Sequence, residues 1–166
     1  MRVLSHESNF DFLPPNFAPI AAMALFAGVY LSGRQAYGVP IVAMLVSDAI
    51  IGFYDLFVMA SVYGSFLLTV VIGRWLGRHK TVLHGAASVV VASTLFYFIT
   101  NFAVWAAPSS FYPHTSAGLI ASYVAGLPFF RYTLAGDAFF TTALFLAFEA
   151  ARALVGQRAA LAEHPR

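Results

Sequence analysis

Two ionisable side chains, Arg131 and Asp137, lie in the apolar stretch GLPFFRYTLAGDAFF, residues 126–140. Inserting an aspartate at the centre of a membrane helix costs about 2.5 to 3.5 kcal/mol, so we expect this pair to face protein or a wet cavity and not lipid. A guanidinium can hold a carboxylate through two parallel hydrogen bonds. Arg131 is therefore expected to pair with Asp137 or Asp48, or to bind an anionic ligand. The pair could also be only a structural clamp, or part of a proton relay.

Other polar side chains recur at helical spacing. Asp48 and Asp55 are seven residues apart, which on one helix places both carboxylates on nearly the same face. Tyr97, Asn101 and Trp105 follow one another at four-residue steps and so share a face as well. The side chains on that face could form hydrogen bonds between helices or belong to an interfacial aromatic belt. Alternatively, they could form one wall of a ligand site.

The sequence offers little support for an enzyme. The chain has no cysteine, which excludes thiolate catalysis, disulfides and cysteine-ligated metals. Zinc motifs, phosphate-binding glycine loops and a Ser–His–Asp order are also missing. His84, which opens an apolar run, is the one histidine placed as a buried ligand, so an intramembrane enzyme or pigment-bearing protein would need it. We expect a non-enzyme with no catalytic residue, metal or cofactor.

The composition places these residues in a bilayer. Hydrophobic residues make up 60% of the 166, and 17 phenylalanines outnumber the 9 basic and the 7 acidic residues. With a mean hydropathy of +0.78, the chain has too little polar surface to coat a water-soluble domain. The net charge of +2 forms no basic stripe, so we expect no nucleic-acid partner.

A helix needs about 20 residues, and at least about 17, to cross the hydrocarbon layer. The apolar runs that meet or approach this length are 17–31, 38–54, 56–76, 82–107 and 132–155. A further run, 118–130, is too short and contains Pro128, so we expect a re-entrant or interfacial helix there. The expected fold is an all-α polytopic transmembrane bundle with five spans and this one extra helix.

Basic residues set the expected orientation, because Lys and Arg concentrate on the cytoplasmic side. The loop RWLGRHK, 74–80, and the arginines of the C-terminal tail should both lie inside. This gives an extracytoplasmic segment at 1–16, a single transmembrane domain at 17–155 and a cytoplasmic tail at 156–166. In this orientation the polar side chains gather near the outer side of the membrane, namely Asp48, Asn101, Trp105, Arg131 and Asp137. A multi-pass protein of a bacterial plasma membrane, with its C-terminus in the cytoplasm, is the expected localisation.

Small residues in the first apolar run have the spacing that lets helices approach closely. The two pairs are Ala18 with Ala22 and Ala24 with Gly28. Such spacing is typical either of packing inside the bundle or of docking a partner subunit.

Several strings of the chain resemble an uncharacterised family of bacterial integral-membrane proteins. They are N-F-x-P-I at 16–20, S-D-x-x-x-G at 47–52, T-N-F-x-V-W at 100–105 and P-F-F-R-x-T-L-x-G-D at 128–137. The likeness runs from about Pro15 to Phe148. It sharpens the class of protein and carries no activity with it.

At the level of topology the chain also looks like the substrate-binding S component of energy-coupling-factor vitamin transporters. That resemblance implies a six-span bundle that captures a micronutrient under its outer loops, and here the first span is missing. Either the chain has five spans with its amino terminus outside, or the native start lies upstream. S components dock their partner through small residues on that span, so Ala18 and Ala22 would have to substitute.

The resulting expectation is a protein that binds a small solute in an outward-facing pocket, as an S-component-like uptake subunit. The ligand-binding residues would be Asp48, Tyr97, Asn101, Trp105, Arg131 and Asp137. The partner-docking residues would be Ala18, Ala22, Ala24 and Gly28. The alternative is a structural accessory subunit of a larger membrane complex. Lipid, a solute and membrane subunits are the expected partners.

Overall fold

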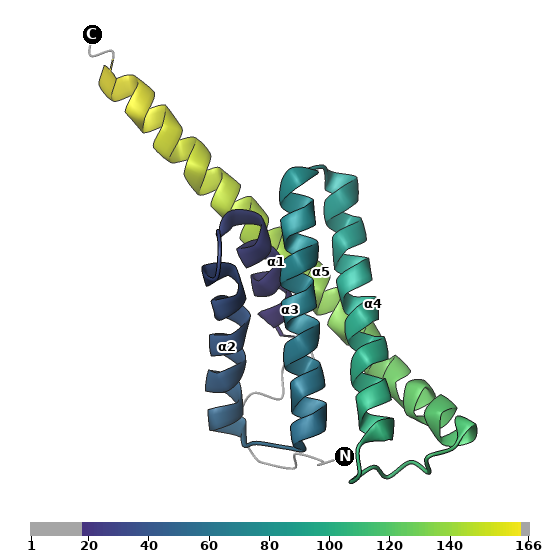
Figure 1. Cartoon of the computed structure of the whole chain (residues 1–166). Coiled ribbons are helices and arrows are strands. Elements are labelled where there is room, and N and C mark those ends of the chain that lie inside the picture. The colour runs from purple at the N-terminus through teal and green to yellow at the C-terminus, as the bar shows by residue number, and fades with distance from the viewer. Residues whose placement is uncertain (1–17, 164–166) are drawn as a thin grey trace, which may run out of the picture.

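The computed structural model describes residues 18–163 of the chain and shows an all-α bundle in that range (Figure 1). The helices are α1 (Ile20–Tyr30), α2 (Gln35–Ile51), α3 (Leu56–Arg78), α4 (Val82–Ala106) and α5 (Ser116–Glu163). Consecutive helices from α2 to α5 run in opposite directions, and α1 packs most extensively against α3. The predicted fold class is confirmed. The predicted segment 1–16 lies outside the described residues.

Three of these helices, α3, α4 and α5, are long and apolar enough to cross a membrane. The expected spans at 56–76 and 82–107 therefore match α3 and α4 closely. The span expected at 17–31 is shorter in the structure. There α1 has 11 residues, which at 1.5 Å per residue covers only about half of a 30 Å hydrocarbon layer. With 17 residues, α2 lies at the lower limit of spanning length.

Glycines allow α1 to lie directly against α3. A β-carbon on Gly28 would come within 2.3 Å of the carbonyl oxygen of Val70, and one on Gly73 within 2.4 Å of that of Leu25. The two backbones therefore touch where these glycines face each other. Around this contact Ala24, Leu25 and Val70 have no accessible surface. The small-residue spacing of the first apolar run thus serves packing within the chain.

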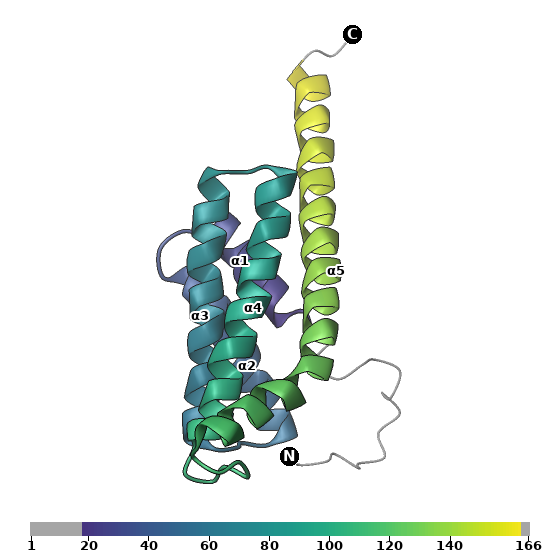
Figure 2. The same cartoon turned by 90° about the vertical axis from the view of Figure 1, so that its right-hand side faces the viewer.

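The segment 118–130 is not a separate helix, which corrects the expectation from the sequence. Residues from Ser116 onward form one continuous helix that contains Pro128 and runs to Glu163. Figure 2 shows that the first part of α5 lies oblique to the rest of the helix. Proline lacks the N–H of the helical hydrogen bond and bends helices without ending them when the flanking turns are held by packing. Residues 156–163, expected in a tail, also belong to α5.

A sharp turn at residues 52–55 separates α2 from α3. Gly52 has φ of +109°, a conformation that residues with a side chain rarely adopt, and it ends α2. Asp55 is then the N-cap of α3, and its carboxylate accepts hydrogen bonds from the backbone N–H groups of Phe57 and Val58. Asp48 and Asp55 therefore do not share a helix face as expected, because the helix ends between them.

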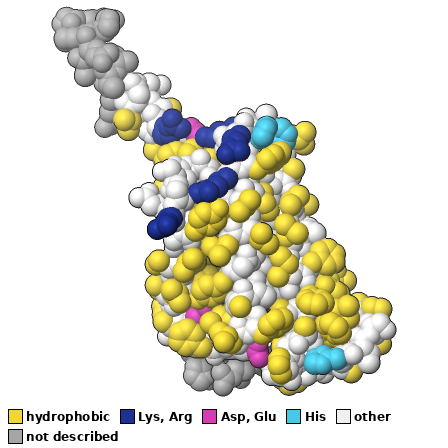
Figure 3. Space-filling model, viewed as in Figure 1, with side chains coloured by type: hydrophobic (Ala, Val, Ile, Leu, Met, Phe, Trp, Pro, Cys, Tyr) yellow, Lys and Arg dark blue, Asp and Glu magenta, His cyan; other side chains and the backbone are white. Residues whose placement is uncertain are grey.

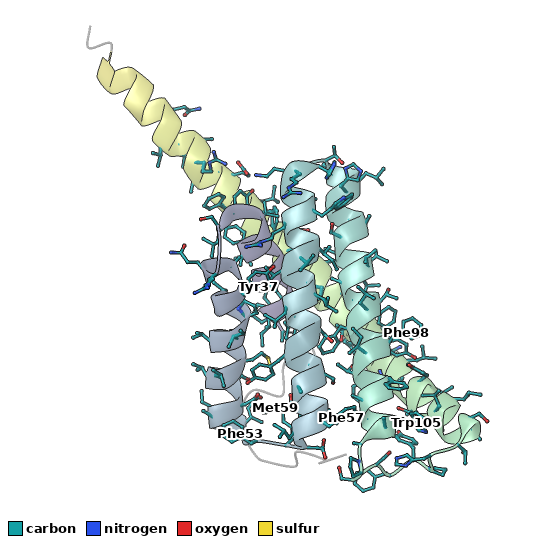
Figure 4. All side chains as sticks on the ribbon, viewed as in Figure 1. Tyr37, Phe53, Phe57, Met59, Phe98 and Trp105 are labelled. Carbon is teal, nitrogen blue, oxygen red and sulfur yellow. The ribbon has the colours of Figure 1, made fainter. Side chains whose placement is uncertain are left out.

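The two ends of the bundle differ in character. In Figure 3 the Lys and Arg side chains lie in the upper part of this face, and hydrophobic side chains are spread over the rest of it. We call the upper end of the bundle the basic end. The opposite end carries the 52–55 turn and the 107–115 loop, and we call it the loop end. Figure 4 shows Phe53, Phe57 and Trp105 at the loop end.

Candidate solute-binding site

A cavity of about 260 Å³ lies between the helices, extending from the 52–55 turn toward the middle of the bundle. It exists because α1 begins halfway along the bundle, so that Ala18, Ile20 and Ala21 form its roof on the side of the basic end. The remaining lining comes from α2, the 52–55 turn, α3, α4 and α5, namely Met44, Ser47, Tyr54, Val62, Phe66, Phe96, Thr133 and Asp137.

Among the described residues that line this cavity, Asp137 is the one with a charged side chain. It is 3% exposed, and one carboxylate oxygen accepts a hydrogen bond of 2.6 Å from the hydroxyl of Ser93. Ser93 lies near the midpoint of α4, so Asp137 lies near the middle of the bundle, deeper than the outer half expected from the sequence. No ion pair to Asp137 occurs in the part of the chain that the structure describes.

Asp48 is a second buried carboxylate, 5% exposed, near the loop end of α2. It accepts a hydrogen bond of 2.7 Å from the hydroxyl of Tyr63 on α3. Burial raises the pKa of the Tyr54 phenol to about 12, and the nearby charge of Asp48 adds to the shift. Asp48 does not line the cavity itself, but its neighbours Ser47 and Tyr54 do.

A smaller cavity of about 130 Å³ adjoins the first, because Phe96 and Thr133 line both. Tyr97 and Asn101 line it from α4, and Gly126 faces them from α5. A β-carbon on Gly126 would lie 2.4 Å from the side-chain oxygen of Asn101, so this glycine makes room for the amide.

The side chains of Tyr97 and Asn101 in this smaller cavity already have backbone partners. The Tyr97 hydroxyl donates to the carbonyl of Tyr123 at 2.6 Å. The Asn101 amide nitrogen donates to the carbonyl of Tyr97 at 2.8 Å. The amide oxygen of Asn101 is the group turned toward Gly126.

Arg131 does not pair with either aspartate, which corrects the central expectation from the sequence. Its side chain is exposed, its Nη2 donates to the hydroxyl of Tyr132 at 3.2 Å, and its guanidinium lies 4.8 Å from the centre of the Tyr132 ring. The reason is helical geometry: on the continuous helix α5, residues six positions apart point about 120° away from each other. Arg131 lines neither cavity.

Trp105 also lies apart from the cavities, at the 107–115 loop. Its ring N–H donates to the carbonyl of Pro113 at 3.1 Å, which ties the loop to α4. A second tie joins this loop to α3, since the Ser109 hydroxyl donates to the carboxylate of Asp55 at 2.8 Å. That hydrogen bond is the largest cause of a lowered pKa at Asp55.

Of the four residues expected to dock a partner, three pack inside the chain and one is exposed. Ala22 and Ala24 have no accessible surface and Gly28 packs on α3, so all three are used inside the chain. Ala18 is exposed and lines the cavity.

His84 lies at the basic end, where its Nδ1 is 2.9 Å from the carbonyl of His79 and 3.0 Å from the hydroxyl of Thr81. Within the described residues, acidic and histidine side chains form no group of three or more that could hold a metal.

Several residues that line the cavities or bind Asp137 escaped the sequence analysis, and two of them carried a readable signal. Ser93 lies one turn before Tyr97 on the face that continues to Asn101. Thr133 lies one turn before Asp137 in the same way. Tyr54 and Phe96 gave no signal, because their place in the lining depends on where α2 ends and where α1 begins.

Residues 1–160, nearly the whole chain, match a family of unknown function, DUF6580. The chain belongs to this family. No curated protein and no solved structure matches this chain. Membership in DUF6580 agrees with the resemblance to an uncharacterised family, and it assigns no ligand to the cavity.

Proposed function

We propose that this DUF6580 protein binds a small solute in the cavity lined by Asp137 and serves as a non-enzymatic uptake subunit, similar in role to an S component. The observation that carries the proposal is the combination of a cavity of about 260 Å³ with a buried carboxylate, Asp137, in its lining. Binding sites of membrane transporters commonly lie near the middle of the bilayer, beside helices that are interrupted there. Here α1 is such a half-length helix.

The roles of the site residues follow from their positions. Asp137 is the polar anchor at the deep end, and Tyr54 and Ser47 lie toward the loop end. Asn101 and Tyr97 face the adjoining cavity, which offers space for a second part of the same solute. Together the two cavities fall within the size range usual for small-molecule sites, about 300 to 1,000 Å³.

The orientation proposed for the protein places the basic end in the cytoplasm, in a bacterial plasma membrane. The cavity then opens toward the loop end, outside the cell, and the C-terminal part of α5 extends into the cytoplasm. The support is the clustering of Lys and Arg at the α3–α4 connection, since positive residues flank spans on the cytoplasmic side.

The proposal is tested with protein purified from its host membrane in mild detergent and examined by native mass spectrometry. We expect the wild type to carry a bound small molecule that Asp137→Asn loses, at equal expression. Asparagine keeps the volume of the side chain and can still accept the hydrogen bond from Ser93. Asp55→Asn is the matched control, because Asp55 lies toward the loop end but lines neither cavity.

The proposal fails if wild type carries no small molecule, or if Asp137→Asn retains it unchanged. A structural accessory subunit is the second candidate, favoured by the projection of α5 beyond the bundle with Leu154 and Val155 exposed (Figure 1). That candidate gains support if the protein copurifies with a large membrane assembly and without a solute.

A further inference from the structure

Negative charge dominates the buried interior of the loop-end half. Asp48 and Asp137 are both buried, and each accepts a hydrogen bond from a neutral hydroxyl. No Lys or Arg side chain is buried among the described residues, and none lines either cavity. An ionised carboxylate without a counter-ion is costly in such a place, and a bound cation would lower that cost.

One positive influence does reach the cavity. The first turn of α1 lies at its roof, and its N-cap residue, Pro19, makes no side-chain hydrogen bond to the N–H groups there. A helix N-terminus carries the equivalent of about half a positive charge. This offsets part of one carboxylate and leaves the pair of aspartates with a net negative charge.

The walls of the cavity are aromatic. Tyr54, Phe66 and Phe96 line it together with Met44, and the rings of Phe66 and Phe96 lie 5.3 Å apart between centroids. Aromatic faces attract cations, and the attraction is stronger where the pair is removed from water. An acidic group at the deep end of an aromatic cavity is the arrangement that recognises an organic ammonium group.

We propose that the solute of this cavity is a small organic cation whose ammonium group pairs with Asp137 while its apolar body lies against Phe66, Phe96 and Tyr54. This inference rests on the proposed function and adds the chemical class of the solute. The cavity of about 260 Å³ is large enough for a solute of roughly ten heavy atoms, given that a water molecule takes about 30 Å³. The hydroxyls of Ser47 and Thr133 remain as polar neighbours in the lining.

The test uses three probes of nearly equal shape: benzylamine, which is cationic at pH 7, benzyl alcohol, which is neutral, and benzoate, which is an anion. Binding to the full chain in detergent is followed by isothermal titration calorimetry, at one salt concentration throughout. We expect benzylamine to bind about tenfold or more tightly than benzyl alcohol, and benzoate to bind least.

Variants separate the charge from the cavity. Asp137→Asn should weaken benzylamine about tenfold or more and leave benzyl alcohol within about twofold, because only the ion pair is removed. Phe96→Leu should weaken both compounds, since it removes an aromatic wall. Asp55→Asn should bind all three probes as the wild type does.

The outcomes distinguish the two proposals. If benzyl alcohol or benzoate binds as tightly as benzylamine and Asp137→Asn makes no difference, the solute is not a cation, although the cavity still binds small molecules. If none of the three probes binds and the purified protein carries no small molecule, the proposed function itself is wrong. A cationic molecule that copurifies with wild type and is lost from Asp137→Asn supports both.

Discussion

At the scale of single residues, the buried carboxylates of Asp48 and Asp137 each accept a hydrogen bond from a hydroxyl on a neighbouring helix. Tyr63 donates to Asp48 at 2.7 Å and Ser93 donates to Asp137 at 2.6 Å. A guanidinium would have required a second charge to leave water, and that desolvation often cancels the Coulombic gain. Arg131 instead stays exposed, with its guanidinium against the ring and the hydroxyl of Tyr132.

The Tyr63 hydroxyl should therefore contribute measurably to stability. Tyr63→Phe leaves the buried carboxylate of Asp48 without its donor, and we expect the free energy of unfolding to fall by about 1 to 3 kcal/mol. Chemical or thermal unfolding of the purified protein in detergent measures this. Tyr132→Phe is the control, because its hydroxyl meets only the exposed Arg131, and its effect should stay within about 0.5 kcal/mol. Equal effects of the two substitutions would contradict the assignment.

Asp55 gives a pH dependence of known sign. The Ser109 hydroxyl and the N–H groups of α3 lower its pKa, so the folded state favours the ionised form. Its contribution to stability is present above the unfolded pKa, about 3.9, and is lost as pH falls through the lower folded pKa. Asp55→Asn keeps the helix cap without the titration. The difference in melting temperature between wild type and Asp55→Asn should therefore be largest near neutral pH and vanish in strong acid. A difference that does not change with pH would contradict this.

At the scale of elements, the contact of α1 with α3 determines where α1 lies. Gly28 and Gly73 bring the two backbones together, and α1 ends near the basic end with its other terminus at the cavity. If α1 moved away from α3, the roof formed by Ile20 and Ala21 would move with it.

We expect Gly28→Ala to destabilise the protein by about 1 to 3 kcal/mol, because the new methyl group meets the backbone of Val70 and cannot be relieved by a side-chain rotation. Gly64→Ala on α3 is the matched control, since nothing lies within 4 Å of its β-carbon. That change should be neutral or stabilise by up to about 1 kcal/mol through helix propensity. Unfolding in detergent measures both. A stable Gly28→Ala would show that the α1–α3 contact is looser than described.

At the scale of the whole molecule, charge and cavity lie at opposite ends. The basic end carries Arg78 in the last turn of α3 and Lys80 in the α3–α4 connection, and the cavity extends to Tyr54 of the 52–55 turn at the other end. A protein oriented by its positive residues would therefore present the cavity to the outside of the cell.

The absence of cysteine makes this orientation simple to test. We expect Ser109→Cys, in the 107–115 loop, to react with a membrane-impermeant maleimide in intact cells. His79→Cys, at the α3–α4 connection, should react only after the membrane is made permeable. Both positions are exposed, so access to reagent is decided by the side of the membrane. The reverse pattern would invert the proposed orientation.

The sequence by itself determined that the chain is helical and suited to a membrane, because hydropathy and span length depend only on local composition. It also placed α3 and α4 and selected Asp48, Asn101 and Asp137 as unusual. Tertiary structure alone decided that α5 is continuous through Pro128, that α1 covers half of the bundle, and that Asp137 meets Ser93 and not Arg131. These three features depend on how neighbouring helices pack against one another. The cavity is the space left between the packed helices, so no single segment of the sequence encodes it.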